Sequence, residues 1–163
     1  MQRIKTLLDK SLELLVMVVV GVLVLDVLWQ VFTRFILKDP SSWTEELATF
    51  LLIWVALLGA AVALGRGAHL GIDYFVLKLP EQTRIKTEIF VFFCIAAFSL
   101  LVMVIGGIGL VKTTLALEQI SPALGLNMGY VYLAVPISGA FLVLYSLLGL
   151  GERFSAVQKG GQA

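Results

Sequence analysis

One acidic residue, Asp26, lies well inside a long apolar run and is the first candidate for chemistry in this sequence. A charged side chain at the centre of a bilayer costs about 2.5–3.5 kcal/mol on insertion scales, so Asp26 must be paired, protonated or facing water. Gln30 and Thr33 follow at helical spacing, so all three share one helix face. They could form a polar seam between helices, a proton or ion site, or a contact with a partner subunit. We expect the seam.

Two adjacent acids, Glu45 and Glu46, resemble the paired carboxylates of a catalytic site. Neighbouring residues of a helix diverge by roughly 100°, so these two cannot point at one substrate. The run Ser42-Trp43-Thr44-Glu45 fits a capping box, in which the serine is the N-cap and the glutamate is the third helical residue. We therefore predict that Glu45 caps a helix. Glu46 is predicted to pair with Arg34 or Lys38, or to contact another protein.

A third polar group consists of Arg66, His69 and Asp73. His69 and Asp73 could pair if their segment is helical, but a general acid–base pair needs a pocket, and the sequence implies none. We expect a loop clamp that fixes the second apolar segment against the third. One His and one Cys in the chain argue against a structural zinc site, and no phosphate loop, nucleophile elbow or HExxH motif occurs. The sequence therefore predicts neither an enzyme nor a cofactor.

Membrane-spanning helices must position these groups. The chain has 163 residues, of which 60% are hydrophobic and 14% are charged, whereas soluble domains carry roughly 25% charged residues. Its net charge of +1 provides no basic field for nucleic acid. Since a span needs about 20 apolar residues, we predict one all-α integral membrane domain over residues 1–155. Its spans are expected at about 12–34, 43–65, 81–118 and 128–150, with a short interfacial helix at 70–79 and a disordered tail at 156–163.

Small residues and one proline predict how these helices pack. The run Gly106-Gly107-Ile108-Gly109 lets another backbone approach the third span, and Pro136 should kink the fourth. The second span carries a stripe of small residues suited to helix–helix contact, formed by Ala56, Gly59, Ala60 and Ala63.

Lysine and arginine residues predict the orientation of the chain. With four spans, both termini and the second loop share one side of the membrane. That side carries Arg3, Lys5, Lys10, Arg66, Lys78, Arg84, Lys86, Arg153 and Lys159, against Arg34, Lys38 and Lys112 on the other side. This bias places both termini in the cytoplasm.

Several short motifs, taken in order, resemble the small membrane subunit of tripartite ATP-independent periplasmic (TRAP) transporters, the DctQ family. The resemblance covers nearly the whole chain. It is carried by Arg34-Phe35, Trp43-Thr44-Glu45-Glu46, Trp54, Gly59-Ala60-Ala61, Gly67-Ala68-His69-Leu70-Gly71-Ile72-Asp73, Leu79-Pro80, Ser121-Pro122-Ala123-Leu124 and Ala134-Val135-Pro136-Ile137. Each motif is weak alone, and their order and spacing make the match specific.

The resemblance implies a three-part importer in the bacterial inner membrane. A periplasmic substrate-binding protein would capture an organic acid, such as sialic acid or a C4-dicarboxylate. A large membrane subunit would carry the acid inward with a sodium gradient, and the small subunit would be its fixed scaffold among the membrane lipids. The residues expected to contact the partner subunit or to be structural are Trp43, Glu45, Glu46, Trp54, Arg66, His69 and Asp73.

A rival hypothesis is a four-span, proton-coupled small multidrug exporter in which Asp26 is the working residue. The strong charge bias argues against this hypothesis, because small exporters of that kind often insert in both orientations. Broken helix pairs, which mark a midplane solute site, are also missing from the sequence.

Overall fold

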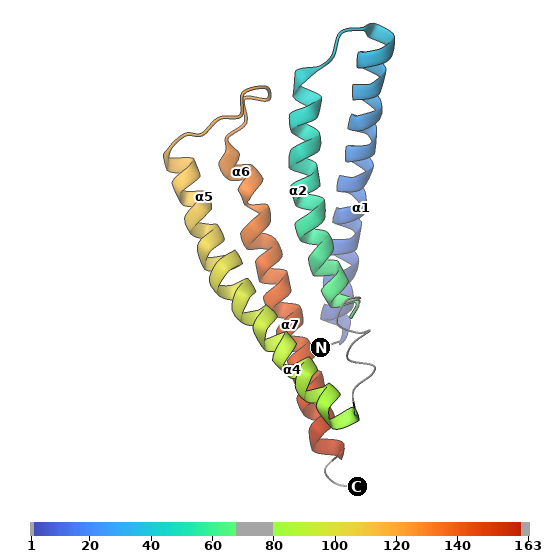
Figure 1. The fold of residues 1–163 in the computed structure, drawn as a ribbon, viewed down its shortest axis with the longest axis vertical. Helices are drawn as coiled ribbons and strands as arrows, with labels where there is room; N and C mark the ends of the chain where they lie inside the picture. Colours follow the sequence, from blue (N-terminus) through green and yellow to red (C-terminus); the bar gives the residue numbers. More distant parts are fainter. Residues whose placement is uncertain (1, 68–79, 161–163) are drawn as a thin grey trace.

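Four long apolar helical segments form the computed structural model, which describes residues 2–67 and 80–160 (Figure 1). Each segment is long and apolar enough to cross a membrane; the spans are Leu8–Leu37, Ser42–Gly65, Thr83–Ala116 and Met128–Gly151. The described ranges contain no β-strand, which confirms the predicted all-helical class with four spans. The interfacial helix predicted at 70–79 lies outside the described residues.

The first two spans form an antiparallel hairpin. Helix α1 (Gln2–Phe32) continues into a π-helical turn, η1 (Thr33–Leu37), and α2 (Ser42–Gly65) runs back beside it. The helix stops because Lys38 adopts a left-handed conformation, with φ of 55°, and Pro40 follows it. The first helix begins well before residue 12, where the sequence predicted the span to start, so it includes the polar residues that precede the apolar run.

The third span is one continuous helix with a π-helical centre. It consists of α4 (Glu81–Phe98), η2 (Ser99–Gly106) and α5 (Gly107–Ala116), close to the predicted range of 81–118. Its 34 membrane-compatible residues extend roughly 50 Å at about 1.5 Å per residue, which exceeds the roughly 30 Å of bilayer hydrocarbon. The helix must therefore tilt or protrude, and Figure 1 shows it inclined to α2.

The fourth span is broken near its start. A single residue, Leu133, separates helix α6 (Met128–Tyr132) from helix α7 (Ala134–Gly160). Pro136 explains the break, because its ring has no N–H and would clash with the carbonyl of Tyr132, four residues earlier. Helix α7 extends to Gly160, so residues 156–160, which we predicted to lie in a disordered tail, are helical.

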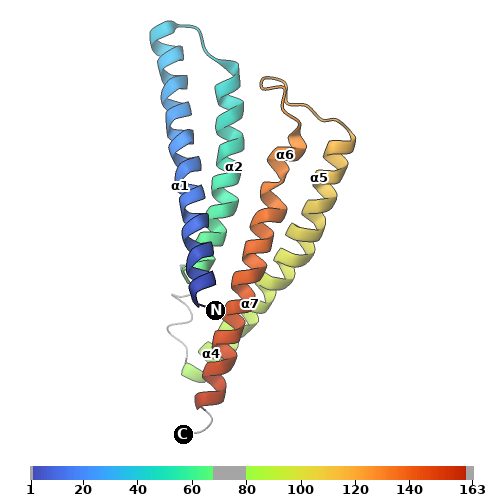
Figure 2. The same cartoon turned by 180° about the vertical axis from the view of Figure 1, so that it is seen from behind.

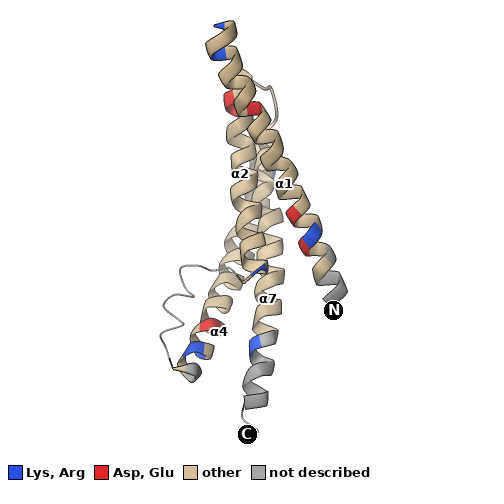
Figure 3. Ribbon diagram, turned by 90° about the vertical axis from the view of Figure 1, so that its right-hand side faces the viewer, with Lys and Arg blue, Asp and Glu red and all other residues tan. Residues whose placement is uncertain are grey.

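The helices lie side by side in a single layer. Helix α1 contacts α2, α2 contacts α7, and α7 contacts the third span; Figure 2 shows this order from behind, and in the edge view of Figure 3 α1, α2 and α7 overlap. Both termini lie at one end, here called the terminal end (Figure 1). The opposite end, the loop end, carries the connections at residues 38–41 and 117–127.

A cluster of buried apolar side chains lies toward the terminal end, where three helices meet. It consists of Leu12 from α1, Leu58, Ala61 and Leu64 from α2, and Tyr145 from α7. Elsewhere large apolar side chains are exposed, among them Leu25, Phe35, Phe90 and Ile105. Apolar faces of this extent need lipid or another membrane protein to cover them.

Candidate functional site

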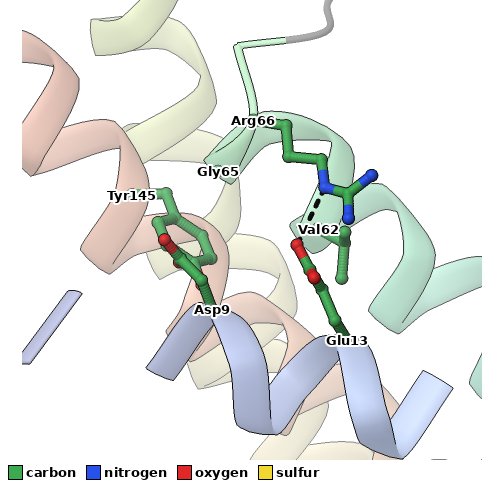
Figure 4. Close-up of a pocket in the computed structure, with 6 residues that line it drawn as sticks. All are labelled: Asp9, Glu13, Val62, Gly65, Arg66 and Tyr145. Atoms are coloured by element: carbon green, nitrogen blue, oxygen red, sulfur yellow. Dashed lines mark hydrogen bonds and ion pairs between the residues drawn. The ribbon is translucent and has the colours of Figure 1, made fainter. Parts of the chain in front are cut away.

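One group of polar contacts lies at the terminal end, beside the core (Figure 4). The Tyr145 hydroxyl donates a hydrogen bond of 2.6 Å to Oδ1 of Asp9, and Arg66 Nε lies 2.8 Å from Glu13 Oε1. We call Asp9, Glu13, Arg66 and Tyr145 the terminal clasp. It joins α1 to both α2 and α7. The hydrogen bond that Arg66 donates to the Glu13 carboxylate raises the pKa of the guanidinium, and arginine is charged at every physiological pH in any case.

Close packing between α2 and α7 completes this region. A Cβ atom added at Gly65 would lie only 3.0–3.2 Å from the ring carbons of Tyr145, so the absent side chain lets the ring lie against α2. The space among the clasp residues measures about 10 Å³, which is about enough for one water molecule. The terminal clasp is therefore a structural joint and holds no solute.

The clamp predicted for Arg66 joins different helices from those expected. We expected Arg66, with His69 and Asp73, to fix the second span against the third. Arg66 instead pairs with Glu13 of the first span, because α1 begins early enough to place that carboxylate beside the end of α2. His69 and Asp73 lie outside the described residues.

A second ionic group joins the other pair of helices near the terminal end. Glu88 of α4 accepts a hydrogen bond of 3.0 Å from Arg84 Nε, one turn earlier. Its other carboxylate oxygen lies 2.9 Å from Nε of Arg153 on α7. Two cations thus share one carboxylate and connect the third span to the fourth.

At the loop end, Glu46 connects the two halves of the layer. Its Oε2 accepts hydrogen bonds from the backbone N–H groups of Ala123 and Leu124, at 3.0 and 2.8 Å. The predicted pairing of Glu46 with Arg34 or Lys38 is therefore wrong. We call this contact the loop latch, because it ties α2 to the connection between the third and fourth spans.

The latched loop has its own internal hydrogen bonds. The Ser121 N–H donates to the carbonyl of Leu126 at 2.8 Å, and the Gly125 N–H donates to the carbonyl of Ser121 at 3.0 Å. Gly125 has a φ of +65°, which glycine adopts without strain. The Asn127 side chain then caps α6 by accepting a hydrogen bond from the Gly129 N–H. The loop therefore presents a defined backbone to Glu46.

The start of α2 differs from the predicted capping box. The N-cap is Ser41 and not Ser42. Thr44 replaces Glu45 as the side chain that contacts the cap: its hydroxyl donates to the Ser41 carbonyl at 2.8 Å and lies 2.7 Å from the Ser41 hydroxyl. Thr44 is fully buried, whereas Glu45 is exposed and free for other contacts.

Asp26, Gln30 and Thr33 lie on one side of the first span, as predicted. In the stretch from Leu12 to Thr33, the least exposed positions other than Glu13 repeat at alternating spacings of four and three, at residues 12, 16, 19, 23, 26, 30 and 33. This period is that of a narrow coiled-coil contact. Asp26 and Thr33 are buried at 6% and 4% exposure. Thr33 donates to the carbonyl of Gln30 within the same helix, and neither carboxyl oxygen of Asp26 has a hydrogen-bond partner among the described residues. A polar seam that joins helices therefore stays a prediction.

The two tryptophans of the candidate set occupy different environments. Trp54 is partly buried and packs on the core. Trp43 is 41% exposed at the loop end and lines a groove there with Trp29. This position suits an aromatic side chain at the membrane interface.

Sequence reasoning missed most residues of the joints. These are Asp9, Glu13, Arg84, Glu88, Tyr145 and Arg153. One pattern was available: Asp9 and Glu13 lie four residues apart and so share one helix face, and Asp9 lies three residues before the buried Leu12. Among the described residues, no cluster of His, Cys, Asp or Glu could hold a metal ion.

Comparison with known proteins places the chain in a family. The model for "Tripartite ATP-independent periplasmic transporters, DctQ component" matches residues 23–156. The chain is 30% identical over 151 residues to the sialic acid TRAP transporter small permease protein SiaQ of Vibrio cholerae, covering 90% of this chain and 83% of that protein. It is 31% identical over 115 residues to the C4-dicarboxylate small permease DctQ of Rhodobacter capsulatus, covering 69% of this chain and 49% of that one.

A further relative is a much longer protein. The sialic acid TRAP transporter permease SiaT of Haemophilus influenzae is 37% identical over 73 residues, which cover 42% of this chain and 12% of SiaT. The family match leaves no basis for the multidrug-exporter hypothesis. Since the family model spans most of the residues, the chain belongs to the DctQ component family of TRAP transporters, and it is a small permease subunit and not an enzyme.

Proposed function

We propose that this small permease subunit is a fixed membrane scaffold for the large permease subunit of its TRAP transporter. One observation carries the proposal: the helices form a thin layer that is joined at both ends and has uncovered apolar faces. The terminal clasp and the Glu88 contacts join neighbouring helices at one end, and the loop latch joins them at the other. Such a layer resists internal sliding and offers a broad surface to a partner.

Helix α2 provides the surface most suited to a partner helix. Its exposed side carries Leu52 and the small residues Ala56 and Ala60, beside the half-buried Gly59. The exposed face of α1 is instead built from bulky side chains such as Leu25 and Leu28. In membranes, small residues let helices approach closely, whereas bulky apolar residues suit lipid. We place the large subunit against α2 and lipid against α1.

Relatives support both the partner and the class of solute. A segment of this chain matches part of a longer sialic acid permease, so the proposed partner is a large permease subunit. The names of the relatives specify sialic acid for SiaQ and a C4-dicarboxylate for DctQ. We propose an organic acid of one of these two kinds, delivered by a periplasmic binding protein and moved by the large subunit with the sodium gradient.

We further propose an inner-membrane location with the terminal end in the cytoplasm. Arg66, Arg84 and Arg153 lie at the terminal end, whereas Arg34 and Lys38 lie at the loop end. Over the whole sequence, nine lysine and arginine residues are assigned to the side of the terminal end and three to the side of the loop end. The side richer in lysine and arginine normally faces the cytoplasm.

Cysteine crosslinking of the assembled transporter tests the scaffold. In a variant with Cys94→Ser, a cysteine at Ala60 should crosslink to cysteines in the large subunit, and a cysteine at Leu25 should not. Crosslinks to the static part of the large subunit should permit solute uptake, and those to its moving part should block it. Loss of uptake with every crosslink would contradict a fixed scaffold. So would saturable binding of the acid to the isolated subunit in calorimetry.

A further inference from the structure

An unpaired carboxyl group lies between the first two helices, at Asp26. The residue is 6% exposed, and neither of its carboxyl oxygens has a hydrogen-bond partner in the described part of the chain. Among the described residues, α2 is the only other long helix whose backbone lies against α1, so the buried side of α1 at this level faces α2. No donor in the described part of the chain satisfies an ionised Asp26 at this position.

No cation on the first two helices is close enough to neutralise Asp26. Helix α2 has no charged or titratable side chain from Leu47 to Gly65. On the first helix, the nearest charged residues are Glu13 and Arg34. Arg34 is eight residues away, about 12 Å along the helix axis at about 1.5 Å per residue, and its side chain is exposed on η1.

The part of helix α7 from Ala134 to Leu150, which precedes Arg153, offers no cation either. From Ala134 to Leu150 its only titratable side chain is Tyr145, and that hydroxyl is bonded to Asp9 near the terminal end. An isolated carboxylate that has left water is unstable, and the group takes up a proton instead. In a membrane this argument is stronger, because lipid supplies no donor.

The polar groups around Asp26 are arranged asymmetrically along the helix. Toward the loop end, the next seam positions are Gln30 and Thr33, and Thr33 lines a groove of about 590 Å³ together with Asp39 and Ser41. Toward the terminal end, the seam positions are Leu23, Val19, Val16 and Leu12. Polar side chains therefore lead from Asp26 to the loop end only.

We propose that Asp26 is a proton-binding site whose carboxyl is protonated in the membrane and exchanges its proton with water of the loop-end groove, along the side of the helix that carries Gln30 and Thr33. The transferred species is a proton alone, taken from water in the loop-end groove, and no covalent bond to carbon changes. The site belongs to the small subunit itself and does not depend on which organic acid the transporter carries.

Infrared spectroscopy of the full chain in lipid nanodiscs, alone and in the complex with its large subunit, tests the protonation. Asp26→Asn should remove a carbonyl band of a protonated carboxylic acid at neutral pH. The matched variant Glu45→Gln, at an exposed acid, should remove a carboxylate band instead. Loss of a carboxylate band in Asp26→Asn, in either preparation, would overturn the proposal.

A labelling experiment on the unmodified sequence covers the case in which Asp26→Asn fails to fold. A hydrophobic carbodiimide reacts with protonated carboxyls in apolar surroundings, so mass spectrometry should find the adduct on Asp26 and not on Glu45. A water-soluble carbodiimide should give the reverse. Adducts on Glu45 alone with both reagents would count against a protonated Asp26.

Hydrogen–deuterium exchange of the Asp26 band tests the route. Gln30→Leu and Thr33→Val should slow the shift of the band in D₂O without removing the band. Leu23→Ile, on the apolar side of Asp26, should leave the exchange rate unchanged. Equal exchange rates in all three variants would overturn the route through Gln30 and Thr33.

Discussion

Glu46 on α2 accepts a hydrogen bond of 2.8 Å from the backbone N–H of Leu124, which lies 78 residues later in the chain. The same carboxylate oxygen also accepts the N–H of Ala123. One side chain thus holds the connection between the third and fourth spans against the start of the second. This is the longest-range tie at the loop end among the described residues, and it makes the two hairpins one unit.

We expect Glu46→Ala to destabilise the subunit by about 2–3 kcal/mol. Each hydrogen bond to a buried charged group contributes roughly 1.5–3 kcal/mol, and the sum for the two bonds is reduced here because Glu46 is only half-buried. Denaturant titration in detergent would measure this loss. Hydrogen exchange at Ala123 and Leu124 should also accelerate.

Glu45→Ala is the matched control, since Glu45 is exposed and Thr44, not Glu45, contacts the N-cap residue Ser41. It should leave both stability and loop exchange nearly unchanged. Equal destabilisation by the two substitutions would show that the loop latch has no special role.

At the terminal end, Tyr145→Phe should cost about 1 kcal/mol, because it removes the hydrogen bond to Asp9 and keeps the buried ring. The same denaturant titration would detect it. Tyr130→Phe is the control, since Tyr130 is 62% exposed and should be neutral. A neutral Tyr145→Phe would mean that Asp9 finds an equally good donor in water.

The spans could be predicted from the sequence because the membrane leaves the backbone few alternatives. A segment in lipid must satisfy its own N–H and C=O groups, so each long apolar run has to be a helix. Pro136 predicts a kink in the fourth span for an equally local reason, because its ring has no N–H to donate within the helix. Such statements depend on composition and nearest neighbours, and these are readable from one sequence.

The joints could not be predicted, because their partners are distant or lack a sequence pattern. The groups that bind Glu46 are backbone N–H groups, which every residue except proline carries, so Arg34 and Lys38 were the more obvious partners. From the sequence alone, several acidic residues could have paired with Arg66. The early start of α1, which the sequence did not predict, brings Glu13 beside it. Ser41 and Ser42 each fit an N-cap, and the choice follows from the extended backbone at Ser41.

The proposed orientation predicts which positions an impermeant thiol reagent reaches in intact cells. In a Cys94→Ser background, single cysteines replacing Lys38 and Asn127 should react from outside, because both positions lie at the loop end. A cysteine replacing Arg84 should react only after the membrane is permeabilised. The reverse pattern would contradict the placement of both termini in the cytoplasm.

Glycine substitutions should separate contacts inside the subunit from contacts with its partner. At Gly139 of α7, an added Cβ would lie 2.7 Å from the Cβ of Met103 and 3.3 Å from its backbone carbonyl carbon. Neither atom is at the end of a flexible side chain, so Gly139→Ala should force α7 away from η2. We expect a loss of about 1–3 kcal/mol, which is typical of overpacking.

Gly59 of α2 gives the opposite expectation, because an added Cβ would have no atom within 4 Å. Gly59→Ala should leave the isolated subunit as stable, or raise its stability by up to about 1 kcal/mol through helix propensity. If the large subunit packs on this side of α2, the bulkier Gly59→Leu should still fold but should lower the yield of the complex in co-purification. Normal yield of the complex with Gly59→Leu would indicate that the large subunit packs on another face of the layer. Failure of the isolated variant to fold would show that Gly59 has a contact within the chain.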